Sequence, residues 1–162
     1  MDGFKFGAQT GWATALAGVM LRDPLVRQAI RTCDALVPMP LHPLRLAERG
    51  YNQSLLLAQA LRRCTDREEK LDRHQAVVRH DWLLRISNTQ AQSRLSLAQR
   101  LRNVRQAFAV AANQSSQLHG KRVVLVDDVM TSGASVQAAA QTLRTAGVHQ
   151  LRVVVFARTE KP

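Results

Sequence analysis

The sequence predicts an α/β fold, in which a central, mainly parallel sheet is flanked by helices. Three apolar runs, at 35–40, 122–126 and 151–157, contain few polar residues, which is typical of strands buried on both faces. Segments with helical spacing separate these runs, and the unit 122–157 has the strand–helix–strand order of a parallel crossover.

The first half of the chain contains two predicted helices and one predicted strand. Residues 12–32 have helical spacing with a break near Pro24, because proline is tolerated in a first turn and disrupts a helix interior. The run 35–40 is a short strand that ends at a proline. A basic loop at 41–50 follows it, and 51–64 are a helix by their periodicity and their good helix formers.

The second half of the chain alternates in the same way. Ser96, with Gln99 three positions later, forms a capping-box pattern that predicts a helix at 96–104. Gly147 is expected to end the helix of the crossover. The other predicted elements are a strand within 75–84, a strand at 107–112, a polar connector at 113–121 and a helix at 135–147.

Length and composition limit the class of protein. The 162 residues suit a single domain, 1–162, and the net charge of +11 favours a polyanionic or phosphorylated partner. Cys33 and Cys64 have no C-x-x-C spacing, so neither a zinc ribbon nor a disulfide scaffold is expected, and reduced thiols suit a cytoplasmic protein. The longest apolar stretch, 12–21, is too short to cross a bilayer, so no membrane insertion is expected.

The stretch "VVLVDDVMTSGASV", 123–136, carries the candidate site. Asp127 and Asp128 follow an apolar strand, and ligands of parallel sheets bind beyond the carboxyl ends of the strands. The loop after them contains Gly133 and leads into a helix N-terminus, which is an anion site. A ligand that combines a phosphate with hydroxyl donors, such as a 5-phosphorylated ribose, fits this arrangement. The acids could instead cap the next turn, or the stretch could be a Walker B strand, for which the chain has no G-x-x-x-x-G-K-[ST] partner.

The motif "VVLVDDVMTSGAS" is similar to the phosphoribosyl pyrophosphate motif of type I phosphoribosyltransferases. The stretches 37–61 and 85–108, together with "FKFG" at 4–7, resemble further signatures of the ComF family. The resemblance implies the type I phosphoribosyltransferase fold, with Mg²⁺ held through the ribose hydroxyls near the acidic pair and without a direct protein ligand. It assigns the ribose and its 5-phosphate to Asp127, Asp128, Thr131, Ser132, Gly133, Ala134 and Ser135.

The same resemblance implies a pyrophosphate loop and a mobile loop. It assigns pyrophosphate to Leu41, His42, Arg45 and Arg49, and it places the mobile loop within 85–100, with Gln92 and Arg94 as its candidates. Arg94 and Arg45 are the catalytic candidates. The chain departs from the family in two ways. It has no four-cysteine zinc ribbon, and Thr131 stands where purine-salvage relatives carry a carboxylate, which disfavours purine salvage.

Two classes of function follow. The first is a phosphoribosyltransferase-like protein linked to DNA uptake in competence. The second is a non-catalytic nucleic-acid-binding accessory protein, whose partners are single-stranded DNA or the DNA-uptake machinery. The net charge of +11 supports the second class. Residues 82–126 contain no acid, which suits cations that stabilise the charge developing on pyrophosphate, a DNA-binding face or an ordinary solvated face. Their cations are Arg85, Arg94, Arg100, Arg102, Arg105, Lys121 and Arg122. Aromatic residues make up only 4% of the chain, which argues against a base-stacking platform.

Overall fold

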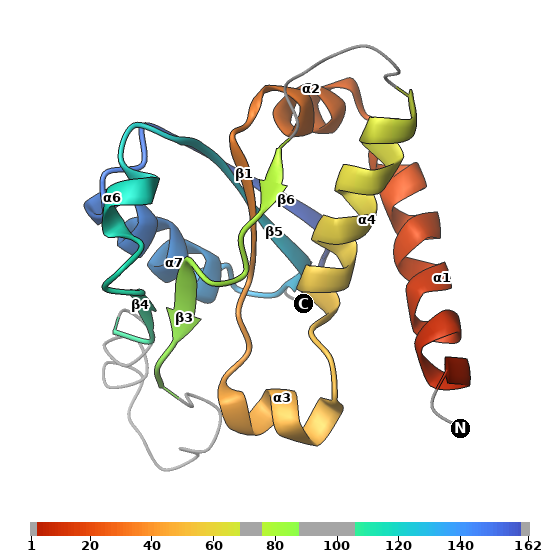
Figure 1. The fold of residues 1–162 in the computed structure, drawn as a ribbon, viewed down its shortest axis with the longest axis horizontal. Helices are drawn as coiled ribbons and strands as arrows, with labels where there is room; N and C mark the ends of the chain where they lie inside the picture. The colour runs from red at the N-terminus through yellow and green to blue at the C-terminus, as the bar shows by residue number, and fades with distance from the viewer. Residues whose placement is uncertain (1–2, 69–75, 88–105, 160–162) are drawn as a thin grey trace.

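A parallel sheet with helices on both faces forms the centre of the molecule (Figure 1). The computed structural model describes residues 3–68, 76–87 and 106–159. The strand order in the sheet is β2 (Val77–Val78), β1 (Ala35–Pro38), β5 (Arg122–Met130) and β6 (Gln150–Arg158), and every pair is parallel. A separate antiparallel pair joins β3 (Leu83–Arg85) to β4 (Phe108–Val110). The predicted fold class is confirmed.

The helices differ in length and in the part of the sheet they cover. α1 (Gly3–Met20), α2 (Pro24–Thr32) and α4 (Gln53–Glu68) pack on one face, and α7 (Ala134–Thr145) packs on the other. The predicted break in the first helical segment is confirmed: α2 has proline in its first turn, and Asp23 accepts a hydrogen bond from the Leu25 N–H at 2.8 Å. Two short helices, α3 (Pro43–Arg49) and α6 (Ser115–Leu118), lie between the larger elements.

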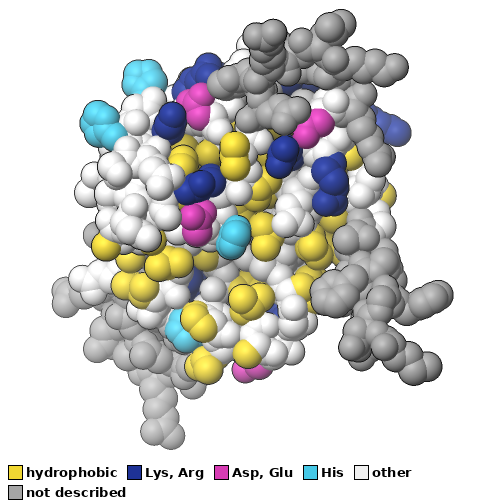
Figure 2. All heavy atoms as spheres, in the orientation of Figure 1, with side chains coloured by type: hydrophobic (Ala, Val, Ile, Leu, Met, Phe, Trp, Pro, Cys, Tyr) yellow, Lys and Arg dark blue, Asp and Glu magenta, His cyan; other side chains and the backbone are white. Residues whose placement is uncertain are grey.

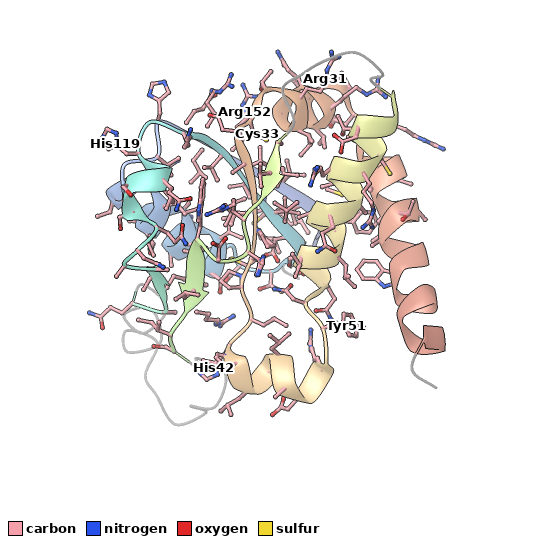
Figure 3. All side chains as sticks on the ribbon, viewed as in Figure 1. Arg31, Cys33, His42, Tyr51, His119 and Arg152 are labelled. Carbon is pink, nitrogen blue, oxygen red and sulfur yellow. The ribbon has the colours of Figure 1, made fainter. Side chains whose placement is uncertain are left out.

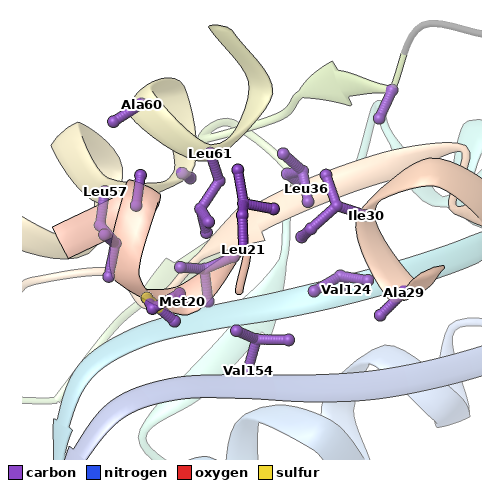
Figure 4. Close-up of a cluster of buried hydrophobic side chains, with 14 of the residues drawn as sticks. Met20, Leu21, Ala29, Ile30, Leu36, Leu57, Ala60, Leu61, Val124 and Val154 are labelled. Atoms are coloured by element: carbon purple, nitrogen blue, oxygen red, sulfur yellow. The ribbon is translucent and has the colours of Figure 1, made fainter. Parts of the chain in front are cut away.

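The central strand β1 is apolar throughout, and its neighbour β5 is apolar over 123–126, because both faces of the sheet are buried there. Side chains such as Leu36 and Val124 point into the cluster formed with α1, α2 and α4 (Figure 4). Their neighbours Val37 and Leu125 point into the cluster formed with α7, β3 and β4. Each such leucine or valine contributes roughly 1.5–3 kcal/mol by leaving water. The packing on both sides therefore holds the carboxyl ends of β1 and β5 in fixed positions next to each other.

The crossover differs from its prediction at both strands. β5 does not stop at Val126 but continues to Met130, because β6 continues to pair with it: Asp127 lies opposite Val155 and Met130 opposite Arg158. β6 was expected to be buried, and this is wrong. It is the edge strand of the described sheet, and Val154 is its one buried residue.

Two predicted connectors contain helix. The predicted loop 41–50 contains α3, which starts at Pro43 and ends at Arg49, and Gly50 caps it in the left-handed conformation with a φ of 77°. The predicted connector 113–121 contains α6, whose Leu118 is fully buried. The predicted helix at 96–104 lies outside the described residues.

Candidate functional site

A pocket of about 160 Å³ lies at the carboxyl ends of β1 and β5. Residues 127–136, from the end of β5 through the following loop to the start of α7, form one wall. The opposite wall comes from elements distant in the sequence and consists of Met39, Pro40, Leu41, Arg49, Gln53, Ser54 and Arg85. All seven residues predicted to bind ribose and its phosphate therefore lie in one pocket.

The acidic pair is held by a single hydroxyl group. Ser54 Oγ lies 3.2 Å from Asp127 Oδ1 and 3.1 Å from Asp128 Oδ1. The Asp128 N–H also donates to Asp127 Oδ1 at 3.1 Å. Burial raises the pKa of Asp127 to about 6, and the adjacent Asp128 carboxylate raises it as well, whereas the Ser54 hydrogen bond acts in the opposite direction. Asp127 is therefore an acid that titrates close to neutral pH.

The N-terminus of α4 places Ser54 beneath this pair. The Asn52 side chain accepts a hydrogen bond from the Leu55 N–H at 3.2 Å and donates to the Met39 carbonyl at 3.0 Å. These bonds cap the helix and tie its first turn to the segment after β1. Leu57 and Leu61, one and two turns further along α4, are fully buried in the core. Ser54 is consequently fixed relative to both strands.

The loop before α7 has the geometry of an anion site. Gly133 is the N-cap residue of α7, with a φ of 77° and a ψ of −5°. In the described structure no side chain caps this helix, whereas Asp23 caps α2 and His42 caps α3. The Ala134 N–H is near Ser132 Oγ, at 3.4 Å. The first N–H groups and the positive end of the helix dipole thus point toward the pocket without a side-chain acceptor at the N-cap.

Arg85 brings a positive charge to the pocket from β3. Its guanidinium lies 5.6 Å from the centre of the Phe108 ring, and its Nε–H donates to the Ser87 carbonyl at 3.4 Å. Burial lowers the pKa of Arg85 from its usual range, and the positive charge of Arg45 lowers it further. The negative charge of Asp127 raises the pKa of Arg85 and so opposes both effects. Arg85 is the only arginine besides Arg49 among the described residues that line the pocket.

The residues predicted for pyrophosphate do not all face this pocket. Leu41 and Arg49 line it. His42 Nδ1 instead accepts from the Leu44 N–H at 3.4 Å, at the start of α3. Arg45 lines neither this pocket nor its neighbour and lies 3.6 Å from Glu48. The mobile-loop candidates Gln92 and Arg94 lie outside the described residues.

A second, larger cavity of about 710 Å³ adjoins the first and shares Pro40, Leu41 and Arg85 with it. It lies between α3, α4 and β3, and most of its lining is apolar. Its lining includes His42 and Tyr51, which Figure 3 places at the α3 end of the molecule. Among its lining residues, Leu46, Leu84 and Ile86 are exposed. Hydrophobic side chains also gather over the lower part of the face in Figure 2.

The acid-free stretch 82–126 does not form one basic face in its described part. Arg85 lies at the pocket, whereas Arg122 opens β5 and binds Asp34, with 2.9 Å between Nη2 and Oδ1. Arg122 and Asp127 are five residues apart on one strand, which corresponds to about 16 Å. Its other arginines, Arg94, Arg100, Arg102 and Arg105, lie outside the described residues.

Ser54 and Arg85 are the site residues that sequence reasoning missed. Arg85 was predicted only as part of the basic stretch and of the range 85–100 given to the mobile loop, and β3 is too short for its pattern to assign a face. Ser54 had a usable signal, because it shares one helical stripe with Leu57, Ala58, Leu61 and Thr65. A serine on an otherwise apolar stripe needs a hydrogen-bond partner in the interior.

Neither a metal cage nor a membrane span is found in the part of the chain that the structure describes. No three histidine, cysteine, aspartate or glutamate side chains gather there in a way that could hold a metal ion. None of its helices has the length and apolar character needed to cross a bilayer.

Comparison with known proteins agrees with this geometry. The profile of the phosphoribosyl transferase domain matches residues 57–162. Competence protein F of Haemophilus influenzae is 32% identical over 158 residues, which cover 96% of this chain and 65% of that protein. DNA utilization protein YhgH of Escherichia coli K12 is 32% identical over 161 residues, or 96% of this chain and 64% of that protein. The chain thus spans about two thirds of the length of these relatives.

The chain is also similar in sequence to a protein of Bacillus subtilis and in fold to a solved structure. Competence protein ComFC of Bacillus subtilis is 34% identical over 112 residues, covering 69% of this chain and 39% of that protein. A glutamine phosphoribosylpyrophosphate amidotransferase from B. subtilis, solved with ADP and GMP, shares the fold with a TM-score of 0.55 and 18% identity, over 91% of this chain and 26% of that one. The chain belongs to the phosphoribosyl transferase domain family, as a member of its ComF branch.

Proposed function

We propose that this protein binds phosphoribosyl pyrophosphate and acts as a phosphoribosyltransferase. The observation that carries the proposal is that a paired carboxylate site and a helix N-terminus without a side-chain cap, entered through a left-handed glycine, share one pocket. Carboxylates accept hydrogen bonds from vicinal hydroxyls, and the helix N-terminus binds phosphate. A 5-phosphorylated ribose offers both groups at the spacing of a single sugar.

Each part of the pocket has a role in this proposal. Asp127 and Asp128 accept hydrogen bonds from the 2- and 3-hydroxyls, and residues 131–135 hold the 5-phosphate. Leu41, Arg49 and Arg85 lie on the opposite wall, where the pyrophosphate group extends. Arg49 keeps the pyrophosphate role predicted for it and Arg85 joins it, because these two arginines line the pocket. When the C1–O bond breaks, charge develops on pyrophosphate, and nearby arginines stabilise that charge.

Mg²⁺ fits this pocket as a partner of the ligand. Two carboxylates from adjacent residues do not form an all-protein cage, which agrees with a cation that keeps most of its contacts to phosphate and water. Bound together with phosphoribosyl pyrophosphate next to Asp127 and Asp128, Mg²⁺ would supply positive charge that offsets the negative charge of the pyrophosphate oxygens. Asp127 and Asp128 would hold the ribose hydroxyls in one orientation.

A second proposed role is contact with DNA during its uptake. The relatives named for competence and DNA utilization support it, as does the net charge of +11. Arg31 and Arg152 lie at the end of the molecule away from His42 and Tyr51 (Figure 3). Arg152 Nη1 donates to Thr32 Oγ1 at 3.2 Å, which places the strand β6 and the helix α2 next to each other there. DNA bound at that end would leave the pocket open.

A salt series separates the two roles. We expect DNA affinity, measured by the anisotropy of a labelled oligonucleotide, to fall steeply as salt rises, with a logarithmic slope of about −0.7 per phosphate contact for a single strand. Binding of phosphoribosyl pyrophosphate with Mg²⁺ should change far less, because its contacts are enclosed by the pocket. If phosphoribosyl pyrophosphate does not bind at any salt concentration, the transferase proposal fails. If the oligonucleotide does not bind at low salt, the DNA proposal fails.

A further inference from the structure

The acidic pair depends on one buried hydroxyl group that the family motif at 123–135 does not contain. Ser54 comes from α4, more than seventy positions earlier in the chain, and only 4% of it is exposed. Its Oγ is within hydrogen-bond distance of one oxygen of each carboxylate. Ser54 is therefore in a position to control both acids at once.

The geometry limits how charge can be distributed in this cluster. A serine hydroxyl has one hydrogen, so it donates to one carboxylate at a time or is shared between the two. Two adjacent carboxylates repel each other, and the burial of Asp127 adds to the cost of its charge. Loss of the hydroxyl would remove one stabilising hydrogen bond from Asp127 and leave that from the Asp128 N–H. The Asp127 carboxyl would then hold its proton more tightly, so its pKa would rise.

We infer that Ser54 is a positioning residue, whose hydroxyl holds the Asp127 and Asp128 carboxylates together as acceptors for the two ribose hydroxyls and stabilises the charge on Asp127. The inference rests on the proposed function, because the ligand concerned is phosphoribosyl pyrophosphate. A hydroxyl group of a sugar donates to an ionised carboxylate, and a protonated carboxyl offers a poorer acceptor. Ser54 therefore acts through the orientation of the pair and the charge of Asp127.

The surroundings of Asp127 support this inference. Asp128 on β5 and burial raise its pKa to about 6, and the hydrogen bond from Ser54 on α4 lowers it. The other charged groups of the pocket are Arg85 on β3, whose positive charge interacts with Asp127 and favours its ionised form, and Arg49 on α3. The positive end of the α4 dipole adds to them, because Ser54 is the second residue of that helix. Even with these groups, Asp127 titrates near neutrality, so loss of one hydrogen bond changes its charge at pH 7.

The test compares Ser54→Ala with Thr65→Ala. Thr65 is a matched control, because it lies on the same helix, is 8% exposed and donates its hydroxyl hydrogen to the Leu61 carbonyl at 2.9 Å, away from the pocket. We expect Ser54→Ala to weaken binding of phosphoribosyl pyrophosphate with Mg²⁺ at pH 6 by about fivefold, because loss of one hydrogen bond raises the pKa of Asp127 by about one unit. The difference from the parent should shrink at pH 8.5, where Asp127 is ionised in both proteins. Thr65→Ala should bind like the parent at both pH values, and Ser54→Thr, which keeps a hydroxyl, should retain the affinity.

A second measurement needs no ligand. Carbon-13 NMR titration of the aspartate carboxyls, assigned with Asp127→Asn, gives the pKa of Asp127 in the unliganded parent and in Ser54→Ala. We expect a higher pKa in Ser54→Ala. An unchanged pKa, or an affinity loss of equal size at every pH, overturns the inference. If phosphoribosyl pyrophosphate binds neither protein, the proposed function fails, and the titration still decides the role of Ser54.

Discussion

Replacing both acids, as Asp127→Asn with Asp128→Asn, is expected to weaken binding of phosphoribosyl pyrophosphate about 100-fold. The amide oxygens still accept hydrogen bonds, but they no longer carry charge, and each charge-assisted bond contributes roughly 0.5–2 kcal/mol more than a neutral one. At about 1.5 kcal/mol each, two such losses amount to about 3 kcal/mol, or two orders of magnitude in the dissociation constant. Calorimetric titration at pH 7.5 with Mg²⁺ measures the change.

The same variant should be at least as stable as the parent at neutral pH. The pKa of Asp127 is raised from 3.8 to about 6 in the folded protein, so its uncharged form favours folding. That contribution is fully present below about pH 4 and is lost as the pH rises through 6, and it amounts to about 3 kcal/mol. The variant lacks this group, so its free energy of unfolding should not show the decline between pH 4 and pH 7.

Asp66→Asn is the control for this experiment. Asp66 is a half-buried carboxylate on the last turns of α4, 3.4 Å from Arg62, and it does not line the pocket. Its replacement should leave ligand affinity unchanged. If the double variant binds phosphoribosyl pyrophosphate as tightly as the parent does, the acidic pair does not hold the ribose hydroxyls.

Gly133→Val should abolish binding of the phosphate group. Gly133 has a φ of 77°, which a β-branched residue adopts at a cost of roughly 1–3 kcal/mol. A Cβ atom there would lie 3.5 Å from Met130 Sδ, an ordinary contact, so the protein itself leaves room for it. A phosphate at the first N–H groups of α7 would meet the branched side chain. We expect affinity for ribose 5-phosphate to fall more than about 100-fold, because charge-assisted bonds to several N–H groups are lost.

Gly120→Val separates backbone strain from loss of the site. Gly120 has a φ of 73°, lies between α6 and β5, and has no atom within 4 Å of an added Cβ. The variant should lose about the same stability as Gly133→Val, measured by urea denaturation, and keep its ligand affinity. Equal binding of ribose 5-phosphate by the parent and by Gly133→Val would remove this loop from the site.

The sequence was sufficient to predict the parts of the fold in which local pattern and burial agree. β1 and β5 are apolar because both faces are covered, and that pattern was recognisable. β6 has a similar run of valines, yet it lies at the edge of the sheet, where composition does not reveal the number of neighbours. α3 was missed because its charged residues suggested a loop, although Pro43 and Gly50 are typical helix boundaries.

The candidate site was predictable where its residues are consecutive. Residues 127–135 share one strand end, one loop and one helix start, so their spacing alone places them together. Ser54 and Arg85 reach the same pocket from α4 and β3, and only the packing of those elements on the sheet brings them there. Nearness in sequence does not bring His42 into this pocket: it follows Leu41 directly, but its side chain caps α3.

Isothermal titration calorimetry with phosphoribosyl pyrophosphate, with and without Mg²⁺, tests the central claim most directly. The account predicts one binding site per chain, tighter binding when Mg²⁺ is present, and competition by ribose 5-phosphate. A folded protein that shows no binding of phosphoribosyl pyrophosphate in the presence of Mg²⁺ would contradict it.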